Sequence, residues 1–169
     1  MSDFISLQEF ERSASTAGIF KGVEIDLLHE TLLSWKSSPG KPYTVLELRD
    51  GKTLAAYAII CKITGRDSTY DIRYFVVDRD YRHTEGSRHL LALIDQELLK
   101  AYPYAVIRAE FSTRKLIGLG ERMLEEEGYR LIGHIKDYHG EGDDYYYFIH
   151  VAYRNKPVFE KPELKIDSN

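Results

Sequence analysis

The chain has 169 residues, 43% of them apolar and 30% charged, which is typical of one soluble globular domain with a sizeable core. Its net charge of −4 argues against general nucleic-acid binding, because nucleic-acid-binding proteins usually present a basic face. The single cysteine, Cys61, excludes an internal disulfide and a cysteine-based zinc site, and its isoleucine neighbours predict a core position. Asp3 and Glu9 interrupt any N-terminal apolar run, and no apolar stretch reaches about 18 residues. We therefore expect a cytoplasmic protein with no signal peptide and no membrane contact.

The first half of the chain predicts a helix followed by three antiparallel strands. Segment 4–12 is ambiguous, because Phe4, Leu7 and Phe10 recur at helical spacing but its first four residues could start a strand. The helix is expected over 23–35, with one side formed by Val23, Leu27, Leu28, Thr31, Leu32 and Trp35. Strands are expected over 43–48 and 54–63, joined by an Asp50-Gly51 turn, and over 70–77.

The second half predicts an alternation of helices and strands. A helix is expected over 87–101, with Ser87 as its N-cap and Pro103 beyond its end. A buried strand over 105–111 and a helix over 113–127 follow, and Gly128 suits a left-handed helix C-cap. Two further strands are expected over 129–138 and 145–153. This order predicts one α/β (α+β) domain over 1–153, built on a mixed, mostly antiparallel sheet flanked by helices, and a tail over 154–169.

The segment 70–91 reads as a buried strand, a basic loop and an amphipathic helix, an arrangement that commonly binds anions. The first N–H groups of a helix lack intrahelical partners and point together at the positive end of the helix dipole. Arg82, His83 and Arg88 bracket the loop and add positive charge. Glu85 is the exception, because it puts a carboxylate where a phosphate would lie.

Three motifs make the chain resemble the GCN5-related N-acetyltransferase (GNAT) superfamily from about Ile19 to Tyr153. The first is Phe75-Val-Val-Asp-x-x-Tyr-Arg before the loop, similar to the family's acetyl-CoA motif. The second is the helix end Glu125-Glu-Glu-Gly-Tyr129. The third and most specific is Asp137-Tyr-His-Gly-Glu-Gly-Asp-Asp-Tyr145, which looks like the ending of a bacterial and archaeal branch of the family.

The resemblance implies acetyl-CoA as cosubstrate, with the thioester held by the backbone at the end of the fourth family strand. The family's loop pattern is Arg/Gln-x-x-Gly-x-Gly/Ala, and this chain places Glu85 and Ser87 at the two glycine positions. Two like charges about 4 Å apart cost roughly 4 kcal/mol, or about a thousandfold in affinity. The cofactor-binding positions implied are Phe75, Val76, Val77, Arg82, His83, Thr84, Glu85, Gly86, Ser87 and Arg88.

The resemblance also suggests the catalytic groups. Some family members carry a carboxylate general base near the position of Asp71, and the alternative is an ion pair between Asp71 and Arg73. Alternation predicts Asp71, Arg73 and Phe75 on one face of the strand and Tyr70, Ile72 and Tyr74 on the other. Leu124 stands where the family usually has its tyrosine acid. Tyr138, expected on the next strand, is the closest substitute in sequence, unless it is simply a strand tyrosine.

The turn-rich segment after Tyr138 is implied to cover the acceptor pocket, with His139, Asp143 and Asp144 as candidate substrate-binding residues. An acidic, aromatic lining suits a cationic amine, whereas the alternative is an exposed acidic hairpin. No histidine spacing supports a metal site. We therefore expect an acetyl-CoA-dependent N-acetyltransferase that acts by direct attack of a small, cationic amine. The alternative is a catalytically impaired ligand-binding or protein-interaction module, and the sequence leaves open a protein acceptor and a homodimer.

Overall fold

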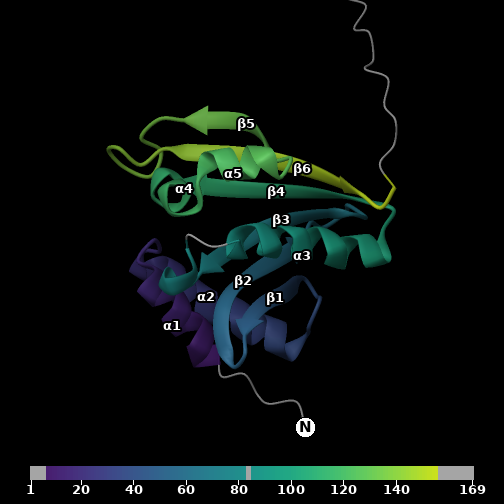
Figure 1. Ribbon diagram of the computed structural model, residues 1–169, viewed down its shortest axis with the longest axis horizontal. Helices are drawn as coiled ribbons and strands as arrows, with labels where there is room; N and C mark the ends of the chain where they lie inside the picture. Colours follow the sequence, from purple (N-terminus) through teal and green to yellow (C-terminus); the bar gives the residue numbers. More distant parts are fainter. Residues whose placement is uncertain (1–6, 83–84, 156–169) are drawn as a thin grey trace, which may run out of the picture.

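The computed structural model describes residues 7–82 and 85–155, which form a mixed six-stranded sheet with helices on both faces (Figure 1). The strand order is β1-β2-β3-β4-β6-β5, and every neighbouring pair is antiparallel except β3 and β4. The strands are β1 (Tyr43–Asp50), β2 (Thr53–Lys62), β3 (Thr69–Val77), β4 (Tyr104–Ser112), β5 (Arg130–Ile135) and β6 (Tyr145–Tyr153). This arrangement confirms the predicted fold class.

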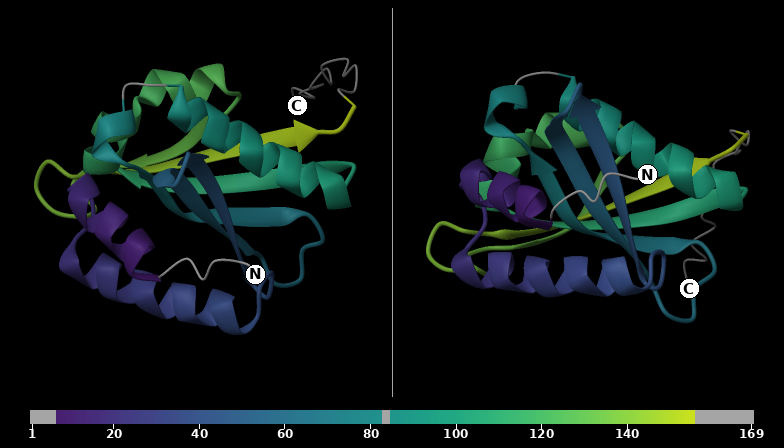
Figure 2. Two further views of the ribbon diagram at one scale, coloured as in Figure 1. Left: turned by 60° about the horizontal axis from the view of Figure 1, so that its bottom comes forward. Right: turned by 90° about the horizontal axis from the view of Figure 1, so that it is seen from below.

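The helices form two groups, one on each face of the sheet (Figure 2). On one face lie α1 (Leu7–Ala17) and α2 (Gly22–Ser37). On the other lie α3 (Gly86–Ala101), α4 (Thr113–Leu119) and α5 (Glu121–Glu126), preceded by the short 3-10 turn η1 (Arg79–Tyr81). No helix of the described residues is both long enough and apolar enough to cross a membrane.

Each face of the sheet has its own core because apolar side chains alternate along the buried strands. Beneath α3 the fully buried residues include Leu90, Ile94, Ile107 and Phe148. Beneath α1 and α2 they include Phe10, Leu28, Leu32, Tyr57 and Ile59. Cys61 is 7% exposed, which confirms its predicted place in the core.

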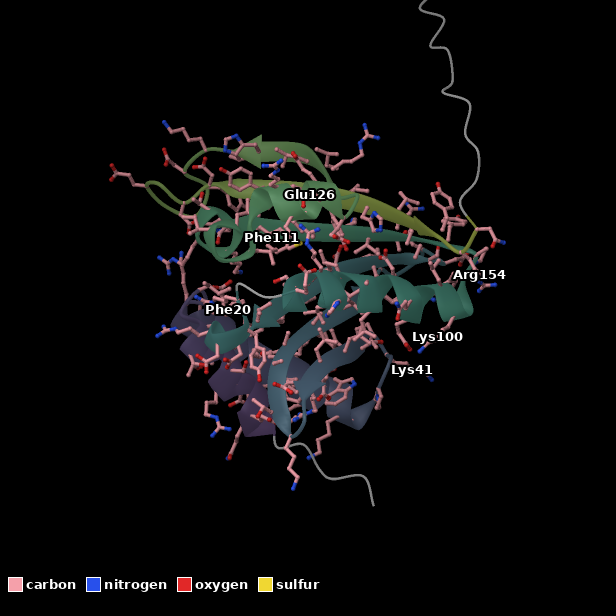
Figure 3. The ribbon with its side chains drawn as sticks, viewed as in Figure 1. Phe20, Lys41, Lys100, Phe111, Glu126 and Arg154 are labelled. Carbon is pink, nitrogen blue, oxygen red and sulfur yellow. The ribbon has the colours of Figure 1, made fainter. Side chains whose placement is uncertain are left out.

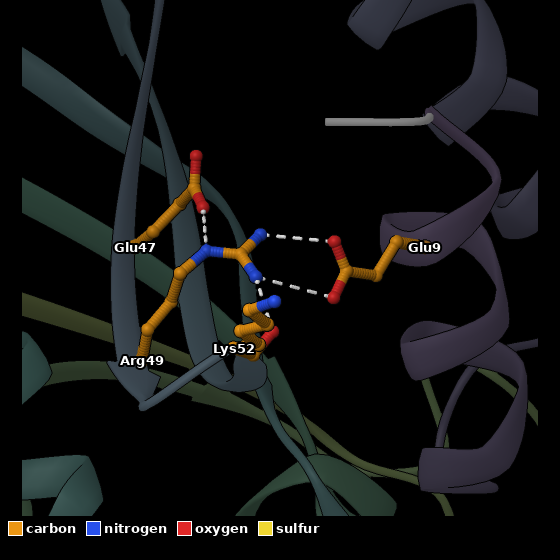
Figure 4. Close-up of polar contacts among 4 residues, drawn as sticks. All are labelled: Glu9, Glu47, Arg49 and Lys52. Carbon is orange, nitrogen blue, oxygen red and sulfur yellow. Dashed lines mark hydrogen bonds and ion pairs between the residues drawn. The ribbon is translucent and has the colours of Figure 1, made fainter. Parts of the chain in front are cut away.

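An ion-pair network fixes α1 over the β1–β2 hairpin (Figure 4). The Arg49 guanidinium donates to both carboxylate oxygens of Glu9, at 2.9 and 3.2 Å, and to Glu47 at 2.9 Å. It also donates to the Lys52 carbonyl at 3.0 Å. The bidentate geometry makes this network stronger than an ordinary surface pair.

Two helix predictions are corrected. The helix predicted over 113–127 is two helices, because Gly120 adopts φ 88° and interrupts the hydrogen-bond ladder between α4 and α5. On α2, the predicted face is only partly buried: Leu28 and Leu32 are enclosed, but Val23 is 61% and Leu27 52% exposed. At the end of α5, Gly128 adopts φ 87°, which confirms the predicted left-handed conformation.

The sheet splits between its two central strands. The parallel pairing of β3 and β4 begins at Thr69 and Val106 and ends at the Ile72–Ala109 pair. Beyond that pair the strands diverge, with Arg73–Val77 on one side and Glu110–Ser112 on the other (Figure 1). The result is a splay that opens toward the carboxyl ends of both strands, the edge at which ligands usually bind in parallel sheets.

A β-bulge at Arg73 accompanies the splay. Ile59 of β2 faces Tyr74 and Ile60 faces Ile72, so Arg73 is an extra residue in β3. The bulge reverses the alternation, and the predicted faces of this strand are therefore wrong. Phe75 and Val77 pack with Tyr70 and Ile72 beneath α3, whereas Tyr74 and Val76 face α1 and α2.

Candidate functional site

The splay forms a narrow apolar slot, which we call the splay slot. Phe75 and Val77 of β3, Phe111 of β4 and Phe20 of the α1–α2 connection line it. Phe20 and Phe111 are labelled in Figure 3. The slot encloses about 30 Å³, roughly the share of one water molecule in the liquid. Aromatic and aliphatic side chains thus line the point where the two strands separate, with Arg73, Arg82, Glu110 and Lys115 also in the lining.

A second cavity of about 210 Å³, the polar-face pocket, adjoins the splay slot on the side of α2. The two share five lining residues and are therefore adjacent: Ile72, Arg73, Glu110, Phe111 and Lys115. Its charged lining is Glu24, Asp71, Arg73, Arg108, Glu110 and Lys115, with His139 and Tyr145 at its edge. The splay slot thus lies next to a pocket with a charged lining.

Asp71, a predicted general base, lies in the polar-face pocket but is held by an arginine of the next strand. Arg108 Nε and Nη2 donate to its two carboxylate oxygens at 2.5 and 2.8 Å. The side chain of Asp71 is 18% exposed and that of Arg108 is 35% exposed. The hydrogen bonds from Arg108 to Asp71 raise the pKa of the guanidinium. The partner of Asp71 is thus Arg108 and not Arg73.

Glu110 of β4 is a carboxylate of the site that the sequence motifs do not single out. It follows Ala109 at the point of divergence and lines both the splay slot and the polar-face pocket. Its contact is with Tyr145 of β6: burial, together with the hydrogen bond to Glu110, raises the pKa of Tyr145 to about 12. Tyr145 therefore stays protonated at neutral pH. Glu110 forms no ion pair within residues 7–82 and 85–155.

An ion pair closes the far side of the polar-face pocket. Lys115 Nζ of α4 lies 2.5 Å from Glu24 Oε1 of α2 and 5.1 Å from the centre of the Phe20 ring. Glu24 also accepts from the Lys21 N–H at 2.8 Å, which caps the first turn of α2. Burial opposes the ionised form, but the hydrogen bonds from Lys115 and Lys21 lower the pKa of Glu24 overall. This ion pair joins α4 to α2, which lie on opposite faces of the sheet, beside the polar-face pocket.

The connector between β5 and β6 contributes unevenly to the site. His139 lines the polar-face pocket, and it also lines, with Asp143, a third cavity of about 250 Å³ beside α2. Asp144 instead bonds to His134 at 2.6 Å and to the Asp137 N–H at 2.8 Å, and these two hydrogen bonds lower the pKa of Asp144. It holds the connector in shape and lines none of the three cavities.

Tyr138 differs from its expected placement. The strand β5 ends at Ile135, so Tyr138 lies in the following turn and not on the strand. Its side chain is 61% exposed, and its ring packs against Tyr145 with centroids 5.0 Å apart. It lines neither the splay slot nor the polar-face pocket. Its predicted role as an acid stays a prediction.

The loop before α3 is placed only in part, since His83 and Thr84 lie outside the described residues. The helix begins at Gly86 with Glu85 at its N-cap, so Ser87 is the second helical residue and not the cap. The Glu85 side chain is 73% exposed, makes no capping hydrogen bond and lies 3.9 Å from Arg88 Nε. Its carboxylate therefore does not occupy the helix N-terminus.

The two described arginines of the predicted anion-binding loop, Arg82 and Arg88, do not point to a common site. Arg82 donates to the Ala17 carbonyl at the end of α1 and lines the splay slot. Arg88 donates to Glu127 at 2.5 Å and pairs with Glu126, which is labelled in Figure 3. Three carboxylates, counting Glu85, thus surround Arg88.

The backbone of β3 still suits an extended amide-bearing ligand. Residues Phe75, Val76 and Val77 pair with β2 on one edge, while their other edge faces the splay and has no pairing to β4 in the described chain. An unpaired strand edge offers N–H and C=O groups to a ligand that lies alongside it. The first turn of α3 starts nine residues after Val77, within reach of the same ligand.

Residues 7–82 and 85–155 contain no group of three or more His, Cys, Asp or Glu side chains that could hold a metal ion.

Comparisons with known proteins identify the fold. No protein-family model and no curated protein sequence matches the chain. A structure described as a GNAT-family acetyltransferase from Desulfovibrio desulfuricans matches with TM-score 0.74 and 20% identity, over 85% of this chain and 91% of that one. The ribosomal-protein-S18-alanine N-acetyltransferase of Escherichia coli matches with TM-score 0.69 and 18% identity, over 94% and 96%.

A third structure, aminoglycoside 6'-N-acetyltransferase complexed with coenzyme A, matches with TM-score 0.66 and 11% identity, over 89% of this chain and 93% of that one. At these identities the likeness establishes the fold and leaves the chemistry to the site. The chain has the GNAT fold, as its motifs predict.

Proposed function

We propose that the protein is an acetyl-CoA-dependent N-acetyltransferase. The observation that carries this proposal is the splay between β3 and β4, which presents an unpaired backbone edge on one side and the Glu110 carboxylate on the other. An acyl donor along the edge and an amine in the polar-face pocket would meet at the splay. The GNAT fold and the solved neighbour with bound coenzyme A support acetyl-CoA as the donor.

The main-chain groups of this protein, and not its charged side chains, would hold the acyl donor. Phe75, Val76 and Val77 supply main-chain groups for the amides of the pantetheine arm, and the first turn of α3 supplies N–H groups for phosphate. Arg88 is bound by carboxylates and Glu85 is exposed, so the helix terminus and not its side chains carries the phosphate interaction.

Glu110 is the best-placed base of the described carboxylates. An aliphatic ammonium with a pKa near 10.4 must lose a proton before it can attack. Glu110 lines the cavity beside Tyr145 and forms no ion pair in the described chain, whereas Asp71 is bound on both oxygens by Arg108. The predicted role of Asp71 as base thus remains the competing proposal.

The reaction balances without a covalent enzyme intermediate. The amine forms the C–N bond at the thioester carbonyl, the C–S bond breaks, and the thiolate takes a proton from solvent or from the protonated base. An ammonium substrate yields an amide, free coenzyme A and one released proton. Cys61 is buried in β2 and does not serve as a nucleophile.

We also propose a small amine as acceptor, since the polar-face pocket holds only about 210 Å³. This is below the roughly 300–1,000 Å³ of sites for drug-sized ligands. A buried free cysteine suits a reducing compartment, which supports a cytoplasmic location.

Acetyl-CoA binding is the first test. At a hundred times its Kd the ligand should add about 2.7 kcal/mol to the free energy of unfolding, measured by thermal or urea denaturation. Desulfo-coenzyme A serves as a control for binding without transfer. No change at millimolar acetyl-CoA would rule out the enzyme and favour a non-catalytic module.

Transfer is tested by thiol release with a panel of amines. Glu110→Gln should lower kcat by at least about a hundredfold, the usual contribution of a general base, while its unfolding midpoint stays near that of the unmodified protein. Glu97→Gln, an exchange on the exposed side of α3, is the matched control and should leave kcat unchanged. If Glu110→Gln retains full activity and Asp71→Asn does not, Asp71 is the base.

A further inference from the structure

Two residues of opposite charge flank the point where β3 and β4 separate. Ile72 and Ala109 are the last paired residues of β3 and β4, and Arg73 and Glu110 follow them directly. Both side chains line the splay slot and the polar-face pocket. They form no ion pair with each other, and within the described ranges 7–82 and 85–155 neither has another ion-pair partner.

Every other lysine, arginine or carboxylate of the polar-face pocket is neutralised by a neighbour. Asp71 is bound by Arg108 at 2.5 and 2.8 Å, and Glu24 is bound by Lys115 at 2.5 Å. Apart from His139, the charges left for a ligand are one guanidinium and one carboxylate. The pocket thus offers a ligand one positive and one negative group. A lining suited to a simple cation would instead have an excess of acidic groups.

We propose that the acceptor is a small zwitterion, namely a free α-amino acid. This inference rests on the proposed function for its chemistry. The substrate ammonium lies toward Glu110, which accepts its proton, and the substrate carboxylate lies toward Arg73. A guanidinium is suited to this task because its planar fork can donate two parallel hydrogen bonds to one carboxylate.

The reaction then gives an N-acetylated amino acid. The amino nitrogen forms a bond to the acetyl carbonyl carbon, the bond between that carbon and the sulfur of coenzyme A breaks, and the carboxylate of the amino acid is unchanged. Arg73 does not take part in these steps. It is a specificity-determining residue that binds the substrate carboxylate, which does not react.

The first experiment measures binding by calorimetry, with and without saturating coenzyme A, so that it does not depend on turnover. Matched triplets of an amino acid, its amide and its decarboxylated amine are compared for three side chains: alanine, leucine and phenylalanine. For at least one triplet, the amino acid should bind about tenfold to a hundredfold more tightly than the other two compounds, the range for a charge-assisted hydrogen-bonded pair.

Arg73→Gln should remove this difference and leave the affinity of the amide and the amine within about twofold. Because Arg73 is exposed and unpaired, the variant should fold, which circular dichroism and the melting temperature verify. The matched control is Arg66→Gln, an exposed arginine outside the cleft, between β2 and β3, which should leave all affinities unchanged. Equal binding of acid and amine, no binding of any triplet, or an equal loss for all three compounds in Arg73→Gln overturns the inference.

The second experiment separates this inference from the proposed function. Initial rates of thiol release from acetyl-CoA are measured with the same triplets, and kcat/KM should fall from acid to amine in the unmodified protein and become level in Arg73→Gln. If amines are acetylated with no preference for the amino acid, the proposal of a zwitterionic acceptor is wrong but the proposed transferase activity stands. Failure to bind acetyl-CoA overturns the transferase, while calorimetry still decides whether the pocket binds amino acids.

Discussion

Replacing Asp71 with asparagine distinguishes a structural carboxylate from a catalytic one. The Asp71 carboxylate accepts two hydrogen bonds from Arg108, at 2.5 and 2.8 Å, across the short parallel pairing of β3 and β4. Asparagine keeps the shape and one acceptor oxygen but loses the charge and offers an N–H₂ group to a guanidinium. We expect Asp71→Asn to lower stability and to leave acetyl transfer largely intact.

The magnitude follows from the exposure of the two side chains. Breaking a fully buried ion pair costs about 3–5 kcal/mol, whereas exposed pairs contribute only about 0–1 kcal/mol. Asp71 is 18% exposed and Arg108 is 35% exposed, so solvent hydrates part of the charge left unpaired. An intermediate cost of about 1.5 kcal/mol follows, which for a chain of this size lowers the melting temperature by roughly 3–6 °C.

The assay is urea unfolding with a double-mutant cycle. Asp71→Asn, Arg108→Gln and the double variant should give a coupling energy of about 1 kcal/mol or more. Asp67→Asn, at an exposed position two residues before β3, is the matched control and should change stability by less than about 0.5 kcal/mol. An Asp71→Asn variant with unchanged stability and a hundredfold lower kcat would refute this reasoning and identify Asp71 as the base.

Three further outcomes are expected. Burial lowers the pKa of His150, but the hydrogen bond that His150 Nε2 donates to the Asp95 carboxylate more than offsets this effect, so the net pKa is raised. The stabilisation is therefore fully present below the ordinary pKa near 6.5 and lost as the pH rises through the raised value; in His150→Gln the urea midpoint should lose this pH dependence. Gly128→Ala should lower the melting temperature, because φ is 87° and a Cβ would lie 3.1 Å from His150 Nδ1, whereas Gly22→Ala, with open space around it, should not. Glu85→Gly should tighten coenzyme A binding by less than about tenfold in calorimetry, since its side chain is exposed; a thousandfold gain would show a direct clash.

Much of the fold follows from hydrophobic periodicity and turn residues. The Asp50-Gly51 turn, the helix ending at Ala101 and the cap at Gly128 each depend on local chemistry that the sequence displays. The corrections fall where tertiary structure decides. Gly120 divides a segment whose periodicity is continuous, and Leu27 is exposed on a helix whose apolar residues cover more than the buried face.

The site was harder to predict, because its contacts cross between strands. The pairing of Asp71 with Arg108 depends on the register of β3 against β4, which no local pattern reveals. Glu110 did leave a signal, since it is the one acidic residue within a largely apolar strand. A carboxylate at such a position is expected to face a cavity or a partner, and here it faces both the cleft and Tyr145.

One local irregularity links the shape of the cleft to its charge. The extra residue at Arg73 bends β3, and the pairing with β4 ends at the residue before it. The same bulge leaves the Arg73 side chain beside the cavity and the backbone of Phe75–Val77 unpaired toward it. Arg73→Gln should therefore remove the charge and keep the cleft, whereas deletion of residue 73 should restore the alternation and close the splay. Loss of acetyl-CoA binding in the deletion variant alone would show that the backbone, and not the guanidinium, builds the donor site.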